Sequence, residues 1–241
     1  MHQIKKFSII TICRNEAAAI RATCDSICAQ CFDEFEWIVI DGGSTDETLK
    51  ILKDYEDKIS CLVSESDQGI YDAMNKGLEL ARGESVIFMN AGDCFADDKA
   101  LACVDALPSA DLLVGNLVLR ESGKLCEFPD TLPPDYLLHC MLPHQATFFK
   151  RRLFDKFGLF DTSFRIAGDY EMFARLFHSG ELHYYHVNET IAVFAGGGIS
   201  SDQKQRSLRR RENHKVRWQY FPRYRYSFKA LRQNIRIFFK I

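Results

Sequence analysis

Three apolar segments near the start of the chain each end in a short polar sequence, and this recurring pattern constrains the fold most. Residues 7–12 lead into Thr11-Ile-Cys-Arg-Asn-Glu16, residues 35–40 into Asp41-Gly-Gly-Ser-Thr-Asp46, and residues 85–89 into Asn90-Ala-Gly-Asp93. Segments that are apolar throughout are typical of parallel strands covered on both faces. Because ligands of open α/β sheets bind outside the carboxyl ends of the strands, these polar residues predict one binding site at one edge of a sheet.

Segments with helical periodicity lie between these strands. A stripe of apolar residues at helical spacing follows the first strand: Ile20, Cys24, Ile27, Cys28 and Cys31. Ser44-Thr-Asp-Glu47 has the form of a capping box, which predicts a helix through residues 49–52. Residues 71–82 predict another helix, ended by Gly83. This alternation predicts an α/β fold, a Rossmann-like and mostly parallel sheet with helices on both faces.

The rest of the chain is less regular. We expect strands at 59–64, 111–119 and 146–149, helices at 100–107, 150–157 and 169–178, a hairpin turn at 120–124 and a loop at 127–143. The composition changes after Gly196-Gly-Gly198. We therefore expect one domain over residues 1–203 and a basic tail over residues 204–241.

Composition excludes several classes of protein. The hydrophobic fraction of 46% is typical of a globular domain, and no apolar run approaches the roughly 18 residues of a membrane-spanning helix. The first six residues lead directly into a strand, so we expect no signal peptide. Nine irregularly spaced cysteines argue against a disulfide framework and favour a reduced, cytoplasmic protein. The absence of a Gly-x-Gly-x-x-Gly or Walker sequence argues against dinucleotide oxidoreductases and NTPases.

Charge is distributed unevenly along the chain. Residues 204–241 hold thirteen Lys and Arg and one acid, Glu212, a net charge of +12, whereas the total is −2 and the remainder therefore carries −14. Cations and aromatic residues alternate in this tail, as in basic amphipathic segments that lie on anionic membranes. A helix packed on the domain with a solvated basic face is the alternative. No nucleic-acid-binding module is recognisable, so nucleic acid is not an expected partner.

The ordered polar series resembles glycosyltransferase family 2 over roughly residues 7–200. Members of this family have the GT-A fold and transfer a sugar from a nucleotide sugar to an acceptor hydroxyl with inversion. The resemblance implies a UDP-sugar donor, with a GDP-sugar as the alternative, and a saccharide acceptor that is often lipid-linked and made at the inner face of the membrane. Asp67-Gln-Gly and Asp72-Ala-Met-Asn also resemble a capsule and exopolysaccharide subgroup.

The resemblance implies a metal site after the strand at 85–89. Asp93 matches the family's metal ligand, whereas Asn90 and Gly92 stand where acids are common, so a single carboxylate is left and Asn90 is expected to contact the donor. Mg²⁺ or Mn²⁺ is typically held by one or two carboxylates together with substrate phosphates. The alternative is that Asp93 only closes a turn.

The resemblance also assigns the nucleoside to the loops after the first two strands. The matching residues of the first loop are Thr11, Arg14, Asn15 and Glu16. Asn15 and Glu16 equally suit a capping role for the following helix. Asp41 matches a residue that lies against base and ribose, or it starts a turn. Gly42 replaces a neighbouring acid thought to read uracil, which leaves the choice of base open.

Two further donor residues come from the segment 67–77, which is also similar to the family. Asp67 matches a position that meets the ribose and diphosphate, and Lys76 is a natural phosphate partner. The alternative for Lys76 is an ordinary solvated position on a helix.

An inverting transferase needs a base that removes the proton of the acceptor hydroxyl. Ala167-Gly-Asp169-Tyr-Glu171 matches the family's base position, so Asp169 is the predicted base and Glu171 the second candidate. The alternative for Asp169 is a first-turn acid stabilised by the helix dipole. His144 precedes this segment and is a candidate to orient the acceptor or a phosphate, although a structural histidine is equally compatible.

A nucleotidyltransferase and a nucleotide-binding protein without catalysis are the alternatives to a glycosyltransferase. A nucleotidyltransferase would show a glycine-rich, basic loop after the first strand, which is missing here. A nucleotide-binding protein without catalysis is compatible with the thin metal motif. Cys24, Cys28 and Cys31 have the spacing of an iron–sulfur motif but continue an apolar helical stripe. His178, His183 and His186 suggest zinc only weakly, since they straddle a turn and a strand, and His186 is an alternative ligand of the active-site metal.

Overall fold

The computed structural model describes residues 5–196, 203–228 and 230–232. The strands are β1 (Phe7–Cys13), β2 (Phe35–Asp41), β3 (Cys61–Ser64), β4 (Ser85–Phe88), β5 (Cys94–Phe95), β6 (Leu112–Leu119), β7 (Lys124–Cys126), β8 (Thr147–Lys150) and β9 (Tyr184–Phe194). The helices are α1 (Ile20–Cys28), α2 (Thr48–Lys53), α3 (Ile70–Leu80), α4 (Ala100–Asp105), α5 (Tyr136–His139), α6 (Arg152–Phe157), α7 (Gly168–His178), α8 (Arg206–Tyr220) and α9 (Pro222–Arg225), with 3₁₀ turns η1 (His144–Ala146) and η2 (Gln203–Gln205).

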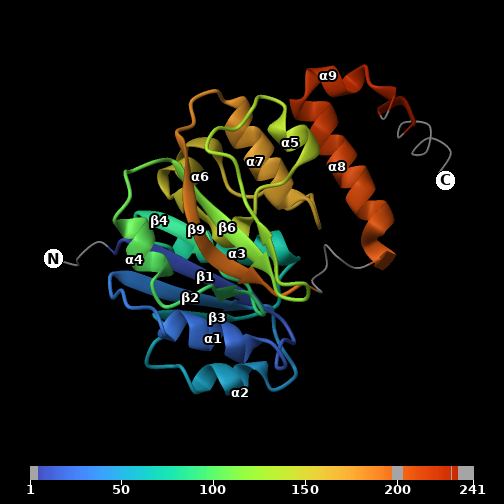
Figure 1. The fold of residues 1–241 in the computed structure, drawn as a ribbon. Helices are drawn as coiled ribbons and strands as arrows, with labels where there is room; N and C mark the ends of the chain where they lie inside the picture. The colour runs from blue at the N-terminus through green and yellow to red at the C-terminus, as the bar shows by residue number, and fades with distance from the viewer. Residues whose placement is uncertain (1–4, 197–202, 229, 233–241) are drawn as a thin grey trace.

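The strands form one mixed sheet in the order β3-β2-β1-β4-β8-β6-β9-β5, with β7 paired to β6 as a hairpin. β3, β2, β1 and β4 are parallel to one another, β8 is antiparallel to both β4 and β6, and β9 is parallel to β6. Helices cover both faces (Figure 1). The predicted α/β fold with a mostly parallel sheet is confirmed.

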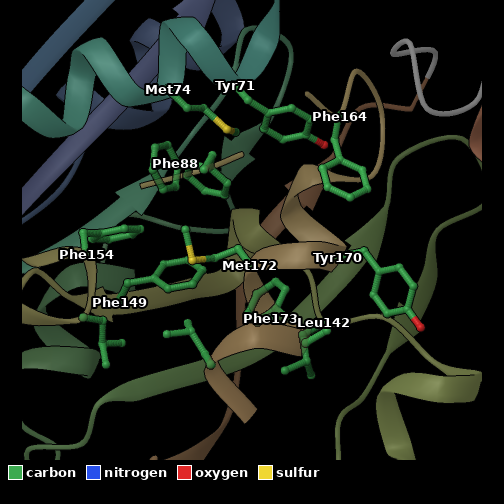
Figure 2. Packing of buried hydrophobic residues seen from close by; sticks show 14 of the residues in the cluster. Tyr71, Met74, Phe88, Leu142, Phe149, Phe154, Phe164, Tyr170, Met172 and Phe173 are labelled. Atoms are coloured by element: carbon green, nitrogen blue, oxygen red, sulfur yellow. The ribbon is translucent and has the colours of Figure 1, made fainter. Parts of the chain in front are cut away.

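Alternate residues of the central strands build two cores. Ile10 and Ile40 face a core shared with α3, α6 and α7, whereas Ile9 and Trp37 face a core shared with α1, α2 and α4. Continuous apolar strands are therefore required, because both faces are covered. The first core is rich in aromatic rings, and Figure 2 shows those of Phe88 and its neighbours converging between the sheet and the helices.

Two local predictions are wrong. α2 begins at Thr48, whose N–H donates to Asp46 at 3.0 Å rather than to Ser44. The Ser44 hydroxyl donates to Asp41, and Glu47 pairs with Lys50 on the surface. The predicted capping box does not form because the Ser44 hydroxyl donates to the buried Asp41 carboxylate instead. α1 ends at Cys28, so Cys31 lies beyond the helix and is exposed.

The C-terminal helix α8 packs beside α7 and contributes Val216 to the aromatic-rich core (Figure 1). The predicted boundary near residue 200 and the last residues of the tail lie outside the described ranges. Within those ranges, none of the helices is both long and apolar enough to span a bilayer.

Candidate active site

Asn15 joins the polar loops that follow β1 and β2. Its backbone is left-handed, with φ of +56°, a conformation that asparagine adopts more readily than most residues. The Asn15 N–H donates to Ser44 Oγ at 2.8 Å, and the Thr45 N–H donates to Asn15 Oδ1 at 2.8 Å. The N-cap of α1 is Ala19, without a side-chain cap, so the alternative that Asn15 or Glu16 caps this helix is wrong.

The other predicted residues of the first loop have different surroundings. Thr11 is buried, and its hydroxyl accepts a hydrogen bond from Trp37 Nε1 at 2.9 Å. The Glu16 N–H donates to Thr48 Oγ1 at 2.8 Å, which adds a second link to the loop after β2. Arg14 is exposed. The Glu16 side chain is half-buried, and the contact of Arg14 with a nucleoside stays a prediction.

Asp41 is fully buried at the end of β2, in register with Cys13 of β1 and Ser64 of β3. Its Oδ2 accepts the N–H groups of Gly43 and Ser44 at 3.1 and 3.0 Å and the Ser64 hydroxyl at 2.7 Å. Burial alone would raise the pKa of Asp41, but these hydrogen bonds, with that of the Ser44 hydroxyl, hold the pKa below its ordinary value. The carboxylate organises the loop, and its contact with base and ribose stays a prediction.

Asp67 occupies the space beside Gly42. A Cβ on residue 42 would overlap Asp67 Oδ2 and lie 3.3 Å from Arg14 Cδ. The other carboxylate oxygen of Asp67 accepts the Gly69 N–H at 3.0 Å, which fixes the side chain to the turn before α3. The glycine at 42 thus leaves room for an acid from a different loop. The structure brings Arg14 and Asp67 together beside Gly42, where the donor is predicted to bind.

Lys76 lies on α3 and is held by the loop that precedes this helix. Its Nζ is 2.7 Å from Glu65 Oε1 and 3.6 Å from Asp72 Oδ2, and it donates to the Ser66 carbonyl at 3.2 Å. The hydrogen bond to Glu65 raises the pKa of Lys76. These contacts fasten the loop of Asp67 to α3, and the predicted phosphate contact stays a prediction.

Asp93 lies in a tight turn after β4 and is 4% exposed. The Thr23 hydroxyl donates to the Asp93 carbonyl at 2.7 Å and accepts the Gly92 N–H at 2.9 Å, and Gly92 has φ of +96°, a region that favours glycine. Asp93 Oδ1 accepts the Ala195 N–H at 2.9 Å. Burial raises the pKa of Asp93 despite the opposing effect of this hydrogen bond. The turn therefore holds a buried carboxylate whose ionised form is not fully stabilised by its hydrogen bonds.

The surroundings of Asp93 fit an oxygen-coordinated cation. Asn90, three residues earlier, has a buried Oδ1 without a hydrogen-bond partner in the described part of the chain. Carboxylate and amide oxygens are the ligands that Mg²⁺ and Mn²⁺ prefer. Among the described residues, no group of three or more His, Cys, Asp or Glu side chains is arranged around a common point. A cation at Asp93 and Asn90 would therefore need the phosphates of a bound donor to complete its coordination.

His144 connects Asn90 to the predicted base. Asn90 Nδ2 lies 3.1 Å from His144 Nε2, and His144 Nδ1 lies 3.4 Å from Asp169 Oδ2. Because an amide nitrogen only donates, this arrangement assigns the His144 proton to Nδ1, which faces Asp169. A continuous polar chain thus joins the turn of Asp93 to Asp169.

Tyr71 supports Asp169 from α3, and sequence analysis did not identify it. Its hydroxyl is shared between the Ile166 carbonyl at 2.7 Å and Asp169 Oδ1 at 3.1 Å. Burial, together with the charge of Asp169, raises the pKa of Tyr71 well above its ordinary value, so the phenol keeps its proton. Asp169 Oδ1 also accepts the Tyr170 N–H at 2.8 Å, which leaves Oδ2 toward His144. A tyrosine at the start of a helix looks like any core aromatic, so no sequence signal marks it.

Glu171, the second candidate base, has a separate environment. It is buried, and Arg175 Nη2 lies 3.0 Å from its Oε2 and Nε lies 3.2 Å from its Oε1. The Tyr220 hydroxyl donates to Oε1 at 2.6 Å. This carboxylate joins α7 to α8 in a paired, buried network, and the observed geometry favours Asp169 for chemistry.

Asp169 and His144 line a cleft of about 580 Å³. Its apolar lining includes Leu119 of β6 and, from the segment before η1, Phe128 and Met141. Its polar lining includes Arg209, Asn213 and Arg217 of α8. A ligand in this cleft would meet a carboxylate, a histidine, apolar surface and arginine side chains.

The other candidate metal residues have local partners. His186 Nδ1 lies 2.8 Å from Asp130 Oδ1, and Nε2 lies 3.0 Å from Asn116 Oδ1, so both ring nitrogens are engaged away from Asp93. Cys24 is buried on α1, and burial raises its pKa to about 12. All nine cysteines are free thiols. The structure does not bring the iron–sulfur or zinc candidates together.

A comparison with protein families covers both the predicted donor loops and the predicted base. The model of the family described as glycosyl transferase family 2 matches residues 8–176, from β1 into α7. The chain belongs to this family. The predicted family is thereby confirmed, and so is membership of a class of enzymes that transfer sugars.

Curated relatives agree with this assignment. The chain is 33% identical over 204 residues to a PGL/p-HBAD biosynthesis glycosyltransferase of Mycobacterium bovis, covering 81% of this chain and 79% of the relative. It is 35% identical over 181 residues to an uncharacterized glycosyltransferase of Mycobacterium tuberculosis, covering 70% and 67% of the two chains. The finer resemblance to a capsule and exopolysaccharide subgroup is not confirmed by these relatives, since the first is named for a different product.

Solved structures share the fold. S. aureus TarS 1–349 in complex with UDP-GlcNAc superposes with a TM-score of 0.70 at 18% identity, covering 90% of this chain and 67% of TarS 1–349. The mannosyltransferase PcManGT from Pyrobaculum calidifontis, in complex with GDP-Man and Mn²⁺, has a TM-score of 0.69 at 20% identity. The chain spans 64% of PcManGT and covers 90% of itself in that match. The GT-A fold of this family is therefore the fold described here.

Proposed function

We propose that this family 2 glycosyltransferase is an inverting enzyme that moves a sugar from a nucleotide sugar to a hydroxyl of a saccharide acceptor. The observation that carries the proposal is the polar chain from Asn90 through His144 to Asp169. It joins a carboxylate in an open cleft to the turn that holds the predicted metal ligand. The proposed donor is a UDP-sugar, with a GDP-sugar as the alternative, and structures of similar fold hold UDP-GlcNAc and GDP-Man.

Asp169 acts as the general base. Its Oδ1 is engaged by Tyr71 and Tyr170, so Oδ2 takes the proton of the acceptor hydroxyl. The acceptor oxygen forms its bond to the anomeric carbon as the bond from that carbon to the diphosphate breaks on the opposite face. The electron pair of the broken bond leaves with the nucleoside diphosphate, and the configuration inverts. His144, with its proton on Nδ1, orients Oδ2.

Asp93 and Asn90 would hold Mg²⁺ or Mn²⁺ together with the donor phosphates. When bound, such a cation neutralises the charge that develops on the leaving diphosphate. Arg14, Asp67 and the loop organised by Asp41 bind base and ribose, and Lys76 meets a phosphate in this proposal. Within the described residues, the buried Asn90 Oδ1 has no hydrogen-bond partner, which supports a role beyond that of a turn residue.

The proposed acceptor is a lipid-linked saccharide, in surface polysaccharide synthesis at the inner face of the membrane. The apolar lining of the cleft suits an acceptor with an apolar portion. Near the C-terminal end of the described chain, Tyr226 is 92% and Phe228 90% exposed, and Arg223 and Arg225 are also exposed. Such aromatic and basic side chains bind the interface of anionic bilayers. Residues 204–241 are thus the proposed docking tail of the domain formed by residues 1–203.

Thermal stabilisation tests the donor half of the proposal. UDP-, GDP- and dTDP-sugars are each added with and without Mn²⁺, and we expect stabilisation by one nucleotide, larger when Mn²⁺ is present. With that donor, the enzyme should transfer labelled sugar to a prenyl-diphosphate-linked saccharide carried in vesicles. A protein that responds to none of the nucleotides contradicts the proposed donor site.

Vesicle sedimentation tests the tail. The full chain should sediment with anionic vesicles more than with neutral ones, and the double variant Tyr226→Ser, Phe228→Ser should sediment less. Because α8 already packs beside α7, equal sedimentation of variant and wild type would contradict membrane docking and leave the tail with its packing role alone.

A further inference from the structure

Glu212 is the single acidic residue of the basic tail, and it lies next to the segment that carries the predicted base. The side chain is 8% exposed on α8. Its Oε1 accepts the Arg165 N–H at 2.9 Å, and its Oε2 accepts the N–H groups of Ile166 and Ala167, each at 2.9 Å. Three consecutive backbone amides therefore converge on one carboxylate from a different helix.

These three amides precede α7, whose N-cap is Ala167 and has no side-chain cap of its own. The first N–H groups of a helix lack partners within the helix, and a negative charge near them is favourable. Successive amides that point to one side form a site for an anion, and Glu212 supplies that anion from within the protein. Burying a carboxylate is costly unless it is hydrogen-bonded, and here the three amides compensate the cost.

The same segment is held from its other side by Tyr71. Its hydroxyl contacts the Ile166 carbonyl at 2.7 Å as well as Asp169 Oδ1 at 3.1 Å. The Ile166 N–H thus donates to Glu212 of α8, and the Ile166 carbonyl accepts from Tyr71 of α3. Only Gly168 lies between Ala167 and Asp169, so a shift of this segment moves the predicted base.

α8 also faces the cleft. Arg209, Asn213 and Arg217, spaced four residues apart on this helix, line the cleft together with Asp169. Glu212 and Val216 lie on the neighbouring face, which is buried against α7 and the core. One helix therefore contributes both to the wall of the cleft and to the support of the base.

We propose that Glu212 is a positioning residue for Asp169. Through this residue, α8 helps to position the proposed base. This inference rests on the proposed function, in which Asp169 is the base. Glu212 holds residues 165–167 in one conformation, so that Asp169 Oδ2 faces His144 and the acceptor. A misplacement of about 1 Å in a catalytic group costs on the order of 100-fold in rate.

Hydrogen exchange tests the structural part of the proposal in the full chain. In Glu212→Gln the amides of residues 165–167 should exchange about tenfold faster or more, because one acceptor oxygen is replaced by a donor. Arg211→Gln, at the exposed neighbouring position, is the matched control and should leave these amides unchanged. Unchanged exchange in Glu212→Gln would overturn the proposal.

Donor hydrolysis tests the catalytic part, with water in place of the acceptor and UDP-GlcNAc plus Mn²⁺ as the probe, or GDP-Man if that donor alone stabilises the protein. We expect kcat of Glu212→Gln to fall about 10- to 100-fold with KM within about twofold, because the donor loops are distant from this contact. Glu212→Asp keeps the carboxylate with a shorter reach and should be intermediate. Faster exchange with an unchanged kcat would show a purely structural role.

A double variant separates the two proposals. In the Asp169→Asn background, Glu212→Gln should cause no further loss of hydrolysis, since its effect passes through Asp169. If Asp169→Asn alone hydrolyses the donor like wild type, the assignment of the base fails. If Asp169→Asn is inactive while Glu212→Gln is fully active, the base stands and only the positioning role fails.

Discussion

The predicted donor end and the predicted acceptor end of the candidate active site are stabilised in different ways. At the donor end, Asp41 takes its partners from positions 2 to 28 residues away in the chain. At the acceptor end, the partners are more distant: Tyr71 is 98 residues from Asp169, Asn90 is 54 residues from His144, and Glu212 is 45 to 47 residues from the amides that it holds. The predicted donor end is a set of short motifs, whereas the predicted base is positioned by contacts between segments that are distant in the chain.

The largest effect is expected from Asp169→Asn. The variant keeps size and most hydrogen bonds but has no basic oxygen of comparable strength, so transfer should fall about 10²- to 10⁴-fold. Nucleotide binding, measured by thermal stabilisation, should equal that of wild type because the donor loops do not contact this residue. Wild-type turnover in the variant would show that Asp169 is not the base. The comparison between the two ends would then no longer concern catalysis.

This contrast also explains how much of the molecule could be predicted from sequence. The apolar strands and the polar residues at their ends predicted the sheet, its buried faces and the clustering of the Asn15 and Asp41 loops. Tyr71 and Glu212 escaped prediction because their partners lie far along the chain and their own neighbours look like a core helix and a basic tail. The capping box at Ser44 failed for a related reason, since Asp41 competes for that hydroxyl from outside the tetrapeptide.

The second prediction concerns the connection between the two ends. Asp93→Ala removes the single acid in the turn after β4 and should weaken Mn²⁺-dependent donor binding by about tenfold or more, while binding without Mn²⁺ changes little. A titration of donor at several Mn²⁺ concentrations measures this. Asp97→Ala, an exposed acid soon after the turn, is the control. Persistence of the full Mn²⁺ dependence in Asp93→Ala would contradict the proposed ligand.

Asp41→Asn should lower the stability of the donor end by about 2 kcal/mol at pH 7, the scale of hydrogen bonds to a buried charged group. Because the pKa of folded Asp41 is depressed, its ionised form stabilises the fold above about pH 4, and this stabilisation is lost as pH falls through the folded pKa. Denaturant unfolding of both proteins across pH measures the difference, which should close toward low pH. Asp54→Asn, which removes an exposed ion-pair partner of Arg21, is the control and should leave stability nearly unchanged. A difference independent of pH would show that Asp41 acts by shape rather than by charge.

Gly42→Ala is the smallest and most local test. The added Cβ would overlap Asp67 Oδ2, the movable end of a side chain, so Asp67 should shift while the strands stay in place. If Asp67 contacts the donor as proposed, donor affinity falls about three- to tenfold with kcat and thermal stability nearly unchanged. The double variant Gly42→Ala, Asp67→Ala should bind donor no more weakly than Asp67→Ala alone, because neighbouring residues that act through one contact are not additive. Additive losses would instead show that residue 42 meets the nucleotide directly, and the donor end would then depend on the glycine itself rather than on the acid that occupies its space.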